Sequence, residues 1–184
     1  INWRHPLELD TEESLRLIDQ VCACGNPLFV LTGGDPMKRQ DLFEIIPYAV
    51  SKKLRVAMTP SGTPLMTRTV VEQLKDAGLA RLAVSLDGSS AEVHDHFRQV
   101  PGSYQWTMNC IEYAREAGLE VQINTTVSRH NLSDLEHLAD LLEQKQISLW
   151  SVFFLVPIGR GKVEDEVTAD DYEAVFQFLA DRYL

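Results

Sequence analysis

The chain is poor in cysteine, and its few cysteines do not indicate a disulfide framework. Its 184 residues include Cys22, Cys24 and Cys110, an odd and sparse set that is typical of a reducing compartment. Cys22 and Cys24 fall in the last turn of a predicted helix, where positions two apart point about 200° from each other around the axis. We therefore interpret the cysteines as ordinary, partly buried side chains and predict no metal ligand within the chain.

Basic side chains and long apolar runs are also scarce. The 17 Lys and Arg residues are outnumbered by 27 Asp and Glu residues, and the formal net charge of -10 disfavours nucleic acid and anionic lipid as partners. No apolar stretch approaches the roughly 20 residues that span a bilayer, and residues 1–10 have neither the basic start nor the apolar centre of a signal peptide. The sequence predicts a cytoplasmic protein that binds neither nucleic acid nor membrane.

Short apolar runs alternate with amphipathic stretches along the chain. The apolar and β-branched runs predict five strands, at 28–32, 54–59, 81–86, 120–127 and 149–156. Apolar residues that recur every three or four positions predict six helices, at 11–24, 40–53, 67–77, 104–117, 132–145 and 168–182. A repeated strand–helix unit is typical of an α/β fold with a parallel sheet.

Two of the predicted helices carry a capping-box signal at their start. The pairs Ser133 with Glu136 and Thr168 with Asp171 have the spacing at which a side chain and a backbone N–H satisfy each other. We expect both pairs to cap their helices.

The first predicted helix begins at Thr11 with only a loop before it. In a repeated strand–helix fold that helix should follow a strand, and a complete eight-unit barrel takes about 250 residues. We therefore expect a partial barrel that lacks its first strand and the loop after it, so that residues 1–184 form a single, incomplete domain. Any chemistry carried by that loop would lie outside this chain.

Each of the five predicted strands ends in or runs into a polar or glycine-rich segment, at 32–36, 59–63, 85–88, 124–126 and 157–161. Each segment alone is compatible with an ordinary turn, because Gly, Pro, Ser, Asn and Asp dominate turns. The opposite connections, such as Lys52-Lys53, lack these clusters. Since ligands of parallel α/β folds gather at the carboxyl edge of the sheet, the five segments together predict a ligand site there.

Several of these segments resemble the motifs of one enzyme family. Gly33-Gly34-Asp35-Pro36 resembles the GGEP motif of radical S-adenosylmethionine (radical SAM) enzymes, with Asp in place of the usual Glu. Matches in the expected order follow at 85–88, 94–98, 101–104, 124–127 and 156–161. The combination resembles the branch that modifies peptides and tetrapyrroles, which includes SPASM-like maturases and haem-biosynthesis enzymes.

The resemblance implies a partial, TIM-like (β/α)6 barrel that uses S-adenosylmethionine and a [4Fe-4S] cluster. In the family a C-x3-C-x2-C motif supplies the cluster thiolates, and the three cysteines here do not have that spacing. We therefore expect the cluster ligands upstream of Ile1 and expect this chain alone to be inactive. With the cluster and an electron donor such as ferredoxin or flavodoxin, the implied reaction generates a 5′-deoxyadenosyl radical that removes hydrogen from a peptide, tetrapyrrole or small-molecule substrate.

The resemblance also implies the residues that hold the methionine group of the cofactor. The turn Gly33-Gly34-Asp35-Pro36 is expected to bind its ammonium, and Ser85 and Arg98 are expected to meet its carboxylate. This assignment is chemically sound, because an Arg guanidinium matches a carboxylate with two parallel hydrogen bonds and a serine hydroxyl adds a third.

Further implied contacts lie on the remaining strand ends. Asn124 is expected at the ribose with Thr59 or Ser61 nearby, the segment Val156-Pro157 is expected beside the adenine, and Asp87 is expected to orient Ser85 or its loop. We predict no catalytic residue, because the difficult chemistry of the family belongs to its cofactors. His94 and His96 are interpreted as loop structure rather than metal ligands.

Two alternatives remain at this stage. A relative without the cluster would be a non-catalytic binding domain. An unrelated TIM-barrel aldolase or isomerase would need a lysine or a carboxylate cluster at the strand ends, and none of the five ends carries a lysine. The choice of substrate is not fixed by this sequence.

Overall fold

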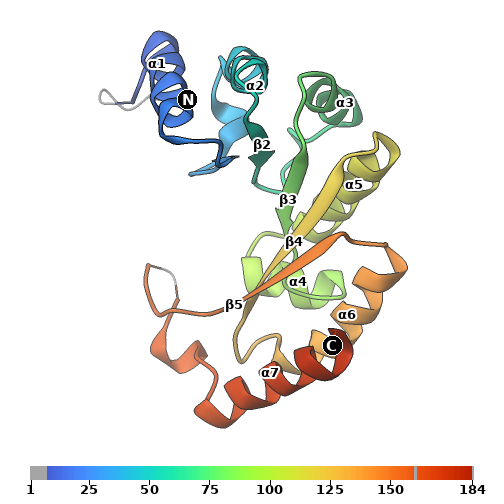
Figure 1. The fold of residues 1–184 in the computed structure, drawn as a ribbon. Coiled ribbons are helices and arrows are strands. Elements are labelled where there is room, and N and C mark those ends of the chain that lie inside the picture. The colour runs from blue at the N-terminus through green and yellow to red at the C-terminus, as the bar shows by residue number, and fades with distance from the viewer. Residues whose placement is uncertain (1–7, 160, 184) are drawn as a thin grey trace.

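Five parallel strands form one curled sheet in the order β1-β2-β3-β4-β5 (Figure 1). The structure is a computed structural model that describes residues 8–159 and 161–183. The strands are β1 (Leu28–Leu31), β2 (Arg55–Met58), β3 (Arg81–Ser85), β4 (Glu120–Val127) and β5 (Leu149–Phe154). Helices line the outer side of the curl (Figure 1), so the predicted α/β fold with a partial, TIM-like barrel is confirmed.

Every predicted helix is present, with ends that differ from the prediction by no more than a few residues. The α-helices are α1 (Thr11–Cys24), α2 (Leu42–Ser51), α3 (Arg68–Asp76), α4 (Ala91–Arg98), α5 (Ser103–Glu116), α6 (Leu135–Gln144) and α7 (Ala169–Tyr183). Short 3-10 turns are η1 (Pro36–Lys38), η2 (Leu132–Asp134) and η3 (Val163–Asp165). The short helix α4 was not predicted. In the described part of the chain, no helix combines the length and apolar character needed to cross a membrane.

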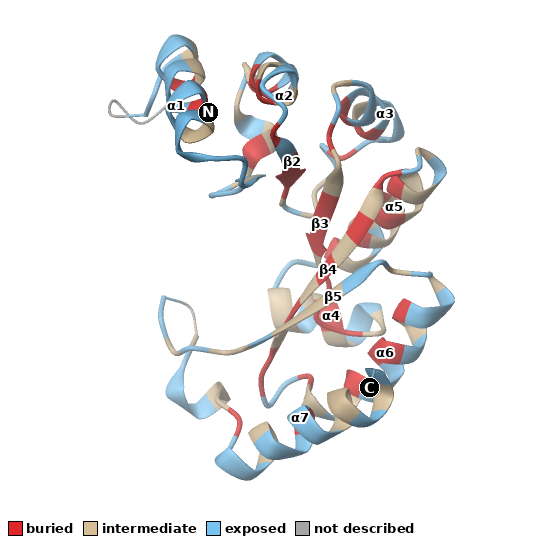
Figure 2. Cartoon of the chain, viewed as in Figure 1, coloured by how far each residue is buried: buried red, intermediate tan, exposed pale blue. Residues whose placement is uncertain are grey.

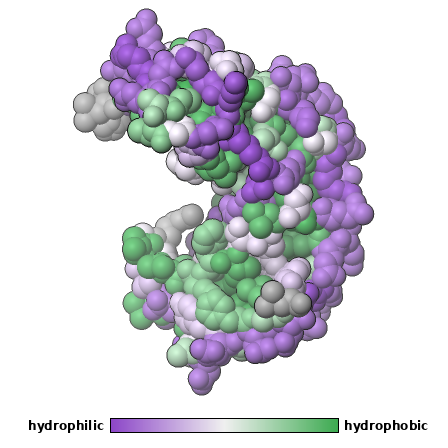
Figure 3. Space-filling model, in the orientation of Figure 1, coloured by the Kyte–Doolittle hydropathy of each residue, from purple (hydrophilic) through white to green (hydrophobic). Residues whose placement is uncertain are grey.

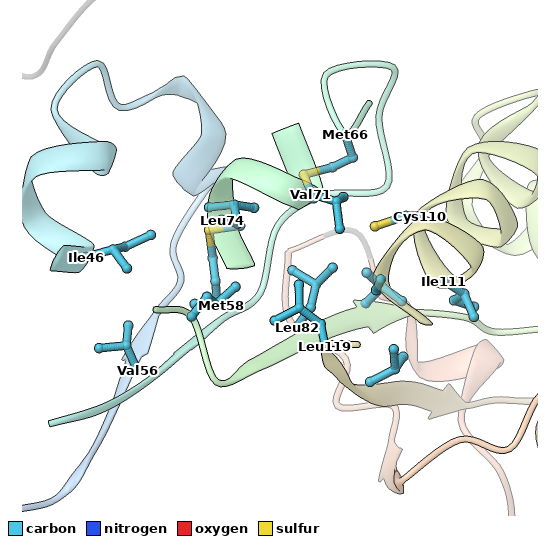
Figure 4. Close-up of a cluster of buried hydrophobic side chains, with 14 of the residues drawn as sticks. Ile46, Val56, Met58, Met66, Val71, Leu74, Leu82, Cys110, Ile111 and Leu119 are labelled. Atoms are coloured by element: carbon cyan, nitrogen blue, oxygen red, sulfur yellow. The ribbon is translucent and has the colours of Figure 1, made fainter. Parts of the chain in front are cut away.

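The hydrophobic core lies between the sheet and the outer helices, and Figure 2 shows the buried residues gathered there. In β4 every second residue is buried, which directs Val121 and Ile123 toward the helices. Met58 and Leu82 reach the same core from the neighbouring strands (Figure 4). Each such aliphatic side chain contributes about 1.5–3 kcal/mol by leaving water. The core therefore holds the strand ends, and the residues that follow them, in fixed positions.

The centre of the inner face of the curled sheet carries small and polar side chains, namely Ala57, Ala83, Gln122, Asn124 and Ser151. The two edge strands β1 and β5 instead present exposed apolar side chains there, Leu28 and Val30 on β1 and Phe153 on β5. Complete TIM barrels fill this space with layers of bulky branched residues. Here the space-filling view shows a deep hollow between the N-terminal and C-terminal parts of the chain (Figure 3). The fold therefore leaves room on its inner side.

One of the two predicted capping boxes is wrong. Helix α6 starts after the turn η2, and its N-cap residue Asp134 makes no capping hydrogen bond; its carboxylate instead accepts hydrogen bonds from the N–H and hydroxyl of Ser89, at 2.6 and 2.7 Å. A partner 45 residues away in the sequence thus replaces the predicted box at 133–136. The box of Thr168 and Asp171 is confirmed, with reciprocal bonds of 2.8 and 3.3 Å.

Candidate functional site

A cavity of about 370 Å³ lies at the carboxyl edge of β1, β2 and β3. It is lined by residues from three strand ends and from α4 and α5. Six of the predicted contact residues line it: Gly33, Gly34, Thr59, Ser61, Ser85 and Arg98. The fold therefore gathers residues that lie far apart in the sequence around one space.

The turn after β1 is held by the side chain of Asp35. Its Oδ1 accepts hydrogen bonds from the backbone N–H groups of Met37 and Ser61, at 3.2 and 3.4 Å. The Ser61 hydroxyl donates to the Gly34 carbonyl at 3.3 Å, and Gly33 has a φ of 127°, which favours glycine. Asp35 Oδ2 is buried and has no hydrogen-bond partner. The turn therefore keeps one acceptor oxygen unsatisfied.

Asp87 lies behind the cavity and holds Arg98. The Asp87 side chain is fully buried, and its Oδ1 accepts a hydrogen bond from the Thr126 N–H at 2.8 Å. Its Oδ2 lies 2.5 Å from Arg98 Nε in an ion pair, although that N–H does not point along a hydrogen bond. Burial raises the pKa of the Asp87 carboxyl, and the Arg98 guanidinium offsets part of that rise. Asp87 thus bonds to Arg98 and β4 rather than to Ser85.

His94 is a cavity residue to which the sequence analysis gave only a structural part. It lies on α4 with 1% of its surface exposed, and the Asp87 N–H donates to its Nδ1 at 3.0 Å. Burial lowers the pKa of His94 to about 4, so the ring is neutral near pH 7 and carries its proton on Nε2. The interpretation of His94 as a residue that holds the loop agrees with this bond. The sequence signal that could have revealed its helix is Ser90, whose hydroxyl caps α4 at Val93.

Other motif residues have structural contacts. Asp95 accepts hydrogen bonds from the N–H groups of Gly102 and Tyr104, at 2.6 and 2.7 Å, and so fixes the start of α5. The ring of His96 packs against that of His130 at 5.6 Å between centroids. Within residues 8–159 and 161–183, no three His, Cys, Asp or Glu side chains gather into a group that could hold a metal ion.

Asn131 is a further residue that the sequence analysis missed. Its side-chain amide donates to the carbonyls of Asp87 and Thr126, each at 2.9 Å, and its Oδ1 accepts from the Ser128 N–H at 2.8 Å. Asn131 is 1% exposed, so these bonds form inside the protein and join the ends of β3 and β4. No local pattern in the sequence indicates a contact between residues 44 positions apart.

The remaining predicted contacts, among them Asp35, are not in the lining of this cavity. Asn124 is paired in register with Ser85, and its Oδ1 accepts a hydrogen bond from Gln122. Pro36 is buried at the start of η1. Val156 follows β5 and is 62% exposed, with Pro157 next to it. Residue 160 of the predicted 156–161 segment lies outside the described residues.

Comparison with known proteins identifies the family. The model of the radical SAM superfamily matches residues 1–142. The chain belongs to the radical SAM superfamily. It is 44% identical, over 96% of its length, to an AdoMet-dependent heme synthase of Oleidesulfovibrio alaskensis, and 44% identical, over 94%, to one of Methanosarcina barkeri.

The radical SAM chain spans about half the length of the curated relatives it matches, namely 46% and 49% of these two. Its fold is similar to that of Streptococcus suis SuiB bound to S-adenosylmethionine, with a TM-score of 0.79 at 16% identity. That match covers 99% of this chain and 43% of SuiB. This likeness concerns the fold of the chain.

Proposed function

We propose that the cavity binds S-adenosylmethionine through its methionine group. The observation that carries this proposal is that Gly33 and Gly34 of the turn, together with Ser61, Ser85 and Arg98, line one cavity with complementary chemistry. The turn offers backbone carbonyls as acceptors, and Asp35 behind it keeps a buried Oδ2 without a hydrogen-bond partner. Ser85 and Arg98 offer donors. An amino acid group, with one ammonium and one carboxylate, matches this division.

The fit is supported by the way Arg98 is held. Its Nε is taken by Asp87, while its terminal nitrogens have no hydrogen bond with any residue in the described ranges. A guanidinium anchored by one edge presents its other donors in a fixed plane, which suits a carboxylate. We assign the rest of the cofactor to the other predicted residues: the ribose to Asn124 with Thr59 or Ser61, and the adenine to Val156 and Pro157.

When bound beside a reduced [4Fe-4S] cluster, S-adenosylmethionine supplies a carbon radical that removes hydrogen from an unactivated position. The residues of this chain bind and orient the cofactor and keep water from it. Its described cysteines are not assigned to the cluster: burial raises the pKa of Cys110 to about 12, and Cys22 and Cys24 lie at the end of α1, away from the cavity.

The substrate we propose is a tetrapyrrole. Two relatives that are 44% identical across nearly all of this chain are AdoMet-dependent heme synthases, whereas the likeness to SuiB, which was solved with a precursor peptide, concerns the fold. We further propose a one-electron donor of the ferredoxin or flavodoxin type and a cytoplasmic location, since a strongly acidic protein with sparse cysteines suits that compartment.

The test uses the complete protein, purified without oxygen with its cluster in place. We expect reduction to convert S-adenosylmethionine to 5′-deoxyadenosine and to change the mass of an added iron porphyrin. Arg98→Ala should weaken S-adenosylmethionine binding by about tenfold to a hundredfold, because it removes a charged hydrogen bond.

The control is Arg129→Ala, since Arg129 bonds to the Glu166 carbonyl outside the cavity. Equal binding by the Arg98 and Arg129 variants would remove Arg98 from the site. Cleavage of S-adenosylmethionine without any change to a panel of porphyrins would overturn the substrate class and leave the cofactor site standing.

A further inference from the structure

A chain of side-chain hydrogen bonds runs along the inner face of the sheet toward the cavity. Arg81 binds Glu120 through Nε and Nη2, at 3.2 and 3.1 Å, and donates from Nη1 to Gln122 Oε1 at 3.4 Å. Gln122 Nε2 then donates to Asn124 Oδ1 at 2.8 Å and to Ser151 Oγ at 3.2 Å. These hydrogen bonds thus join Arg81, at the amino end of β3, to Asn124 in the middle of β4, which pairs with Ser85 at the carboxyl end of β3.

The direction of these hydrogen bonds is fixed by chemistry. A guanidinium has donors only, so the group of Gln122 that faces Arg81 must be the carbonyl oxygen. A flipped Gln122 would place its NH2 group against an Arg81 N–H. The Gln122 NH2 therefore faces Asn124, and Asn124 must present its oxygen in return. Glu120 holds Arg81 with two contacts, so the first member of the chain is itself anchored.

This order of hydrogen bonds leaves unused donors on the last members of the series, which lie nearest the cavity. Asn124 pairs in register with Ser85, which lines the cavity, and with Ser151 on β5. With its oxygen occupied, Asn124 has its NH2 group left, and that group has no hydrogen bond with any described residue. Ser151 accepts from Gln122 and so keeps its own proton to donate.

We propose that Gln122 is a positioning residue that holds Asn124 as a hydrogen-bond donor toward an acceptor oxygen of the ligand beside Ser85. The inference rests on the proposed function, in which that oxygen belongs to the ribose of S-adenosylmethionine. Arg81 sets the direction of the chain, and Ser151 supplies a second donor. An amide that is already oriented binds without the entropy cost of selecting one of its two orientations.

The polarity itself can be tested without a ligand. Side-chain amide hydrogen exchange, measured by NMR on the complete protein, should show the Gln122 NH2 protected and the Asn124 NH2 exchanging freely. The reverse pattern would overturn the proposal.

The consequence for binding is tested with Gln122→Glu and S-adenosylhomocysteine as the probe in calorimetry. The new carboxylate keeps the contact with Arg81 but accepts only, so Asn124 must turn its NH2 group toward it and away from the ligand. We expect the Kd to rise about tenfold, as for the loss of one hydrogen bond. Asn124→Ala should have a similar effect, and the double variant should be no weaker than Asn124→Ala alone.

A matched control is available on α5, where Gln105 Nε2 donates to Asn109 Oδ1 at 2.8 Å on the exposed surface. Gln105→Glu should leave the Kd unchanged. If Asn124→Ala weakens binding and Gln122→Glu does not, the positioning role is wrong while the cofactor site stands. If the wild-type protein does not bind the probe, the proposed function fails, and the exchange measurement still decides the polarity of the chain.

Discussion

The amino and carboxyl edges of the sheet both carry charged and polar side chains, but the two edges differ in whether those side chains have hydrogen-bond or ion-pair partners. At the amino edge, Arg55 and Arg81 both contact Glu120, at 2.5 and 3.1 Å, so these charges satisfy one another. At the carboxyl edge, the buried oxygens Asp35 Oδ2 and Thr63 Oγ1 have no hydrogen-bond partner among the described residues, and a third, Asp87 Oδ2, has only its ion pair with Arg98. One of them follows each of β1, β2 and β3.

This difference separates polar groups that are satisfied within the fold from polar groups that are left without a partner near the proposed binding site. A buried polar atom without a partner costs about 1–3 kcal/mol, whereas an exposed ion pair contributes about 1 kcal/mol or less. The two oxygens without any partner follow β1 and β2, and Thr63 lines the cavity. Stability is therefore given up at the edge where binding is proposed, as expected of functional sites.

The largest effect should come from Asp87→Ala. The change leaves the partly buried Thr126 N–H without its acceptor and Arg98 without its counter-charge, so we expect a loss of about 3 kcal/mol in the free energy of unfolding. At the amino edge, Arg55→Ala should cost about 1 kcal/mol or less, because the side chain is exposed. Urea denaturation measures both. Similar losses in the two variants would abolish the distinction between the edges.

Asp87→Asn separates the two parts of that effect. The amide keeps an acceptor for Thr126 and removes the charge that burial disfavours, so most of the stability should remain. Its NH2 group faces the guanidinium of Arg98, so the positioning of Arg98 should be lost together with cofactor affinity. An Asp87→Asn variant as unstable as Asp87→Ala would show that the charge itself supports the fold.

Glycine-to-alanine substitutions test how closely other atoms pack against the backbone at the two edges. A Cβ at Gly88, on the carboxyl edge, would lie 2.7 Å from the backbone nitrogen of His94, which only a shift of α4 can relieve. We expect Gly88→Ala to cost about 2–3 kcal/mol. Gly118, on the amino edge, has open space around it and a φ of 68°, so Gly118→Ala should cost about 1 kcal/mol of backbone strain. Thermal denaturation of both variants would contradict this account if Gly118→Ala were the more damaging.

The two edges should also respond to acid at different pH. The pKa of His94 is about 4 in the folded chain and 6.5 ordinarily, so only the unfolded chain gains this proton as the pH falls below 6.5. Stability is therefore lost between pH 6.5 and about 4, by about 2 kcal/mol at pH 5. His94→Asn keeps an acceptor for the Asp87 N–H and should remove this slope. Parallel pH curves for the two proteins would rule out a neutral, buried His94.

At the amino edge, the corresponding titrating group is Glu120. Hydrogen bonds and charge from Arg81 and Arg55 lower the pKa of this carboxyl below its ordinary 4.5. Its contribution is thus present above that value and is lost only as the pH falls further. The acid response between pH 6.5 and 4.5 therefore distinguishes His94 from the ion pairs of the opposite edge.

Long periodic elements could be predicted from the sequence, and tertiary pairing could not. Helix α1 and strand β4 have the predicted bounds, because fourteen and eight residues show a clear period. Helix α4 has eight residues between two loops, too few to establish a period. The meeting of Gly33 and Gly34 with Ser61 and Ser85 at one cavity followed from parallel strands having their carboxyl ends at one edge.

Which atom pairs with which at the site depends on contacts that no local pattern encodes. The second acceptor role of Asp35 involves Ser61, 26 residues away, and Asp87 meets Thr126, 39 residues away. The orientation of Asn124 depends on Gln122 and Arg81, from two strands. The sequence therefore predicted which residues form the site better than it predicted the hydrogen bonds among them.

The smallest effect, and the one of opposite sign, is expected from Thr63→Val. The Thr63 hydroxyl is buried without a partner, so its removal should raise the free energy of unfolding by up to about 1 kcal/mol. Affinity for S-adenosylhomocysteine should fall if this oxygen serves the ligand. Thr125→Val is the contrast, because the Thr125 hydroxyl bonds to the Leu86 carbonyl and Trp150 Nε1, so that variant should lose stability. A destabilised Thr63→Val protein with unchanged affinity would mean that the carboxyl edge holds its polar atoms for the fold alone.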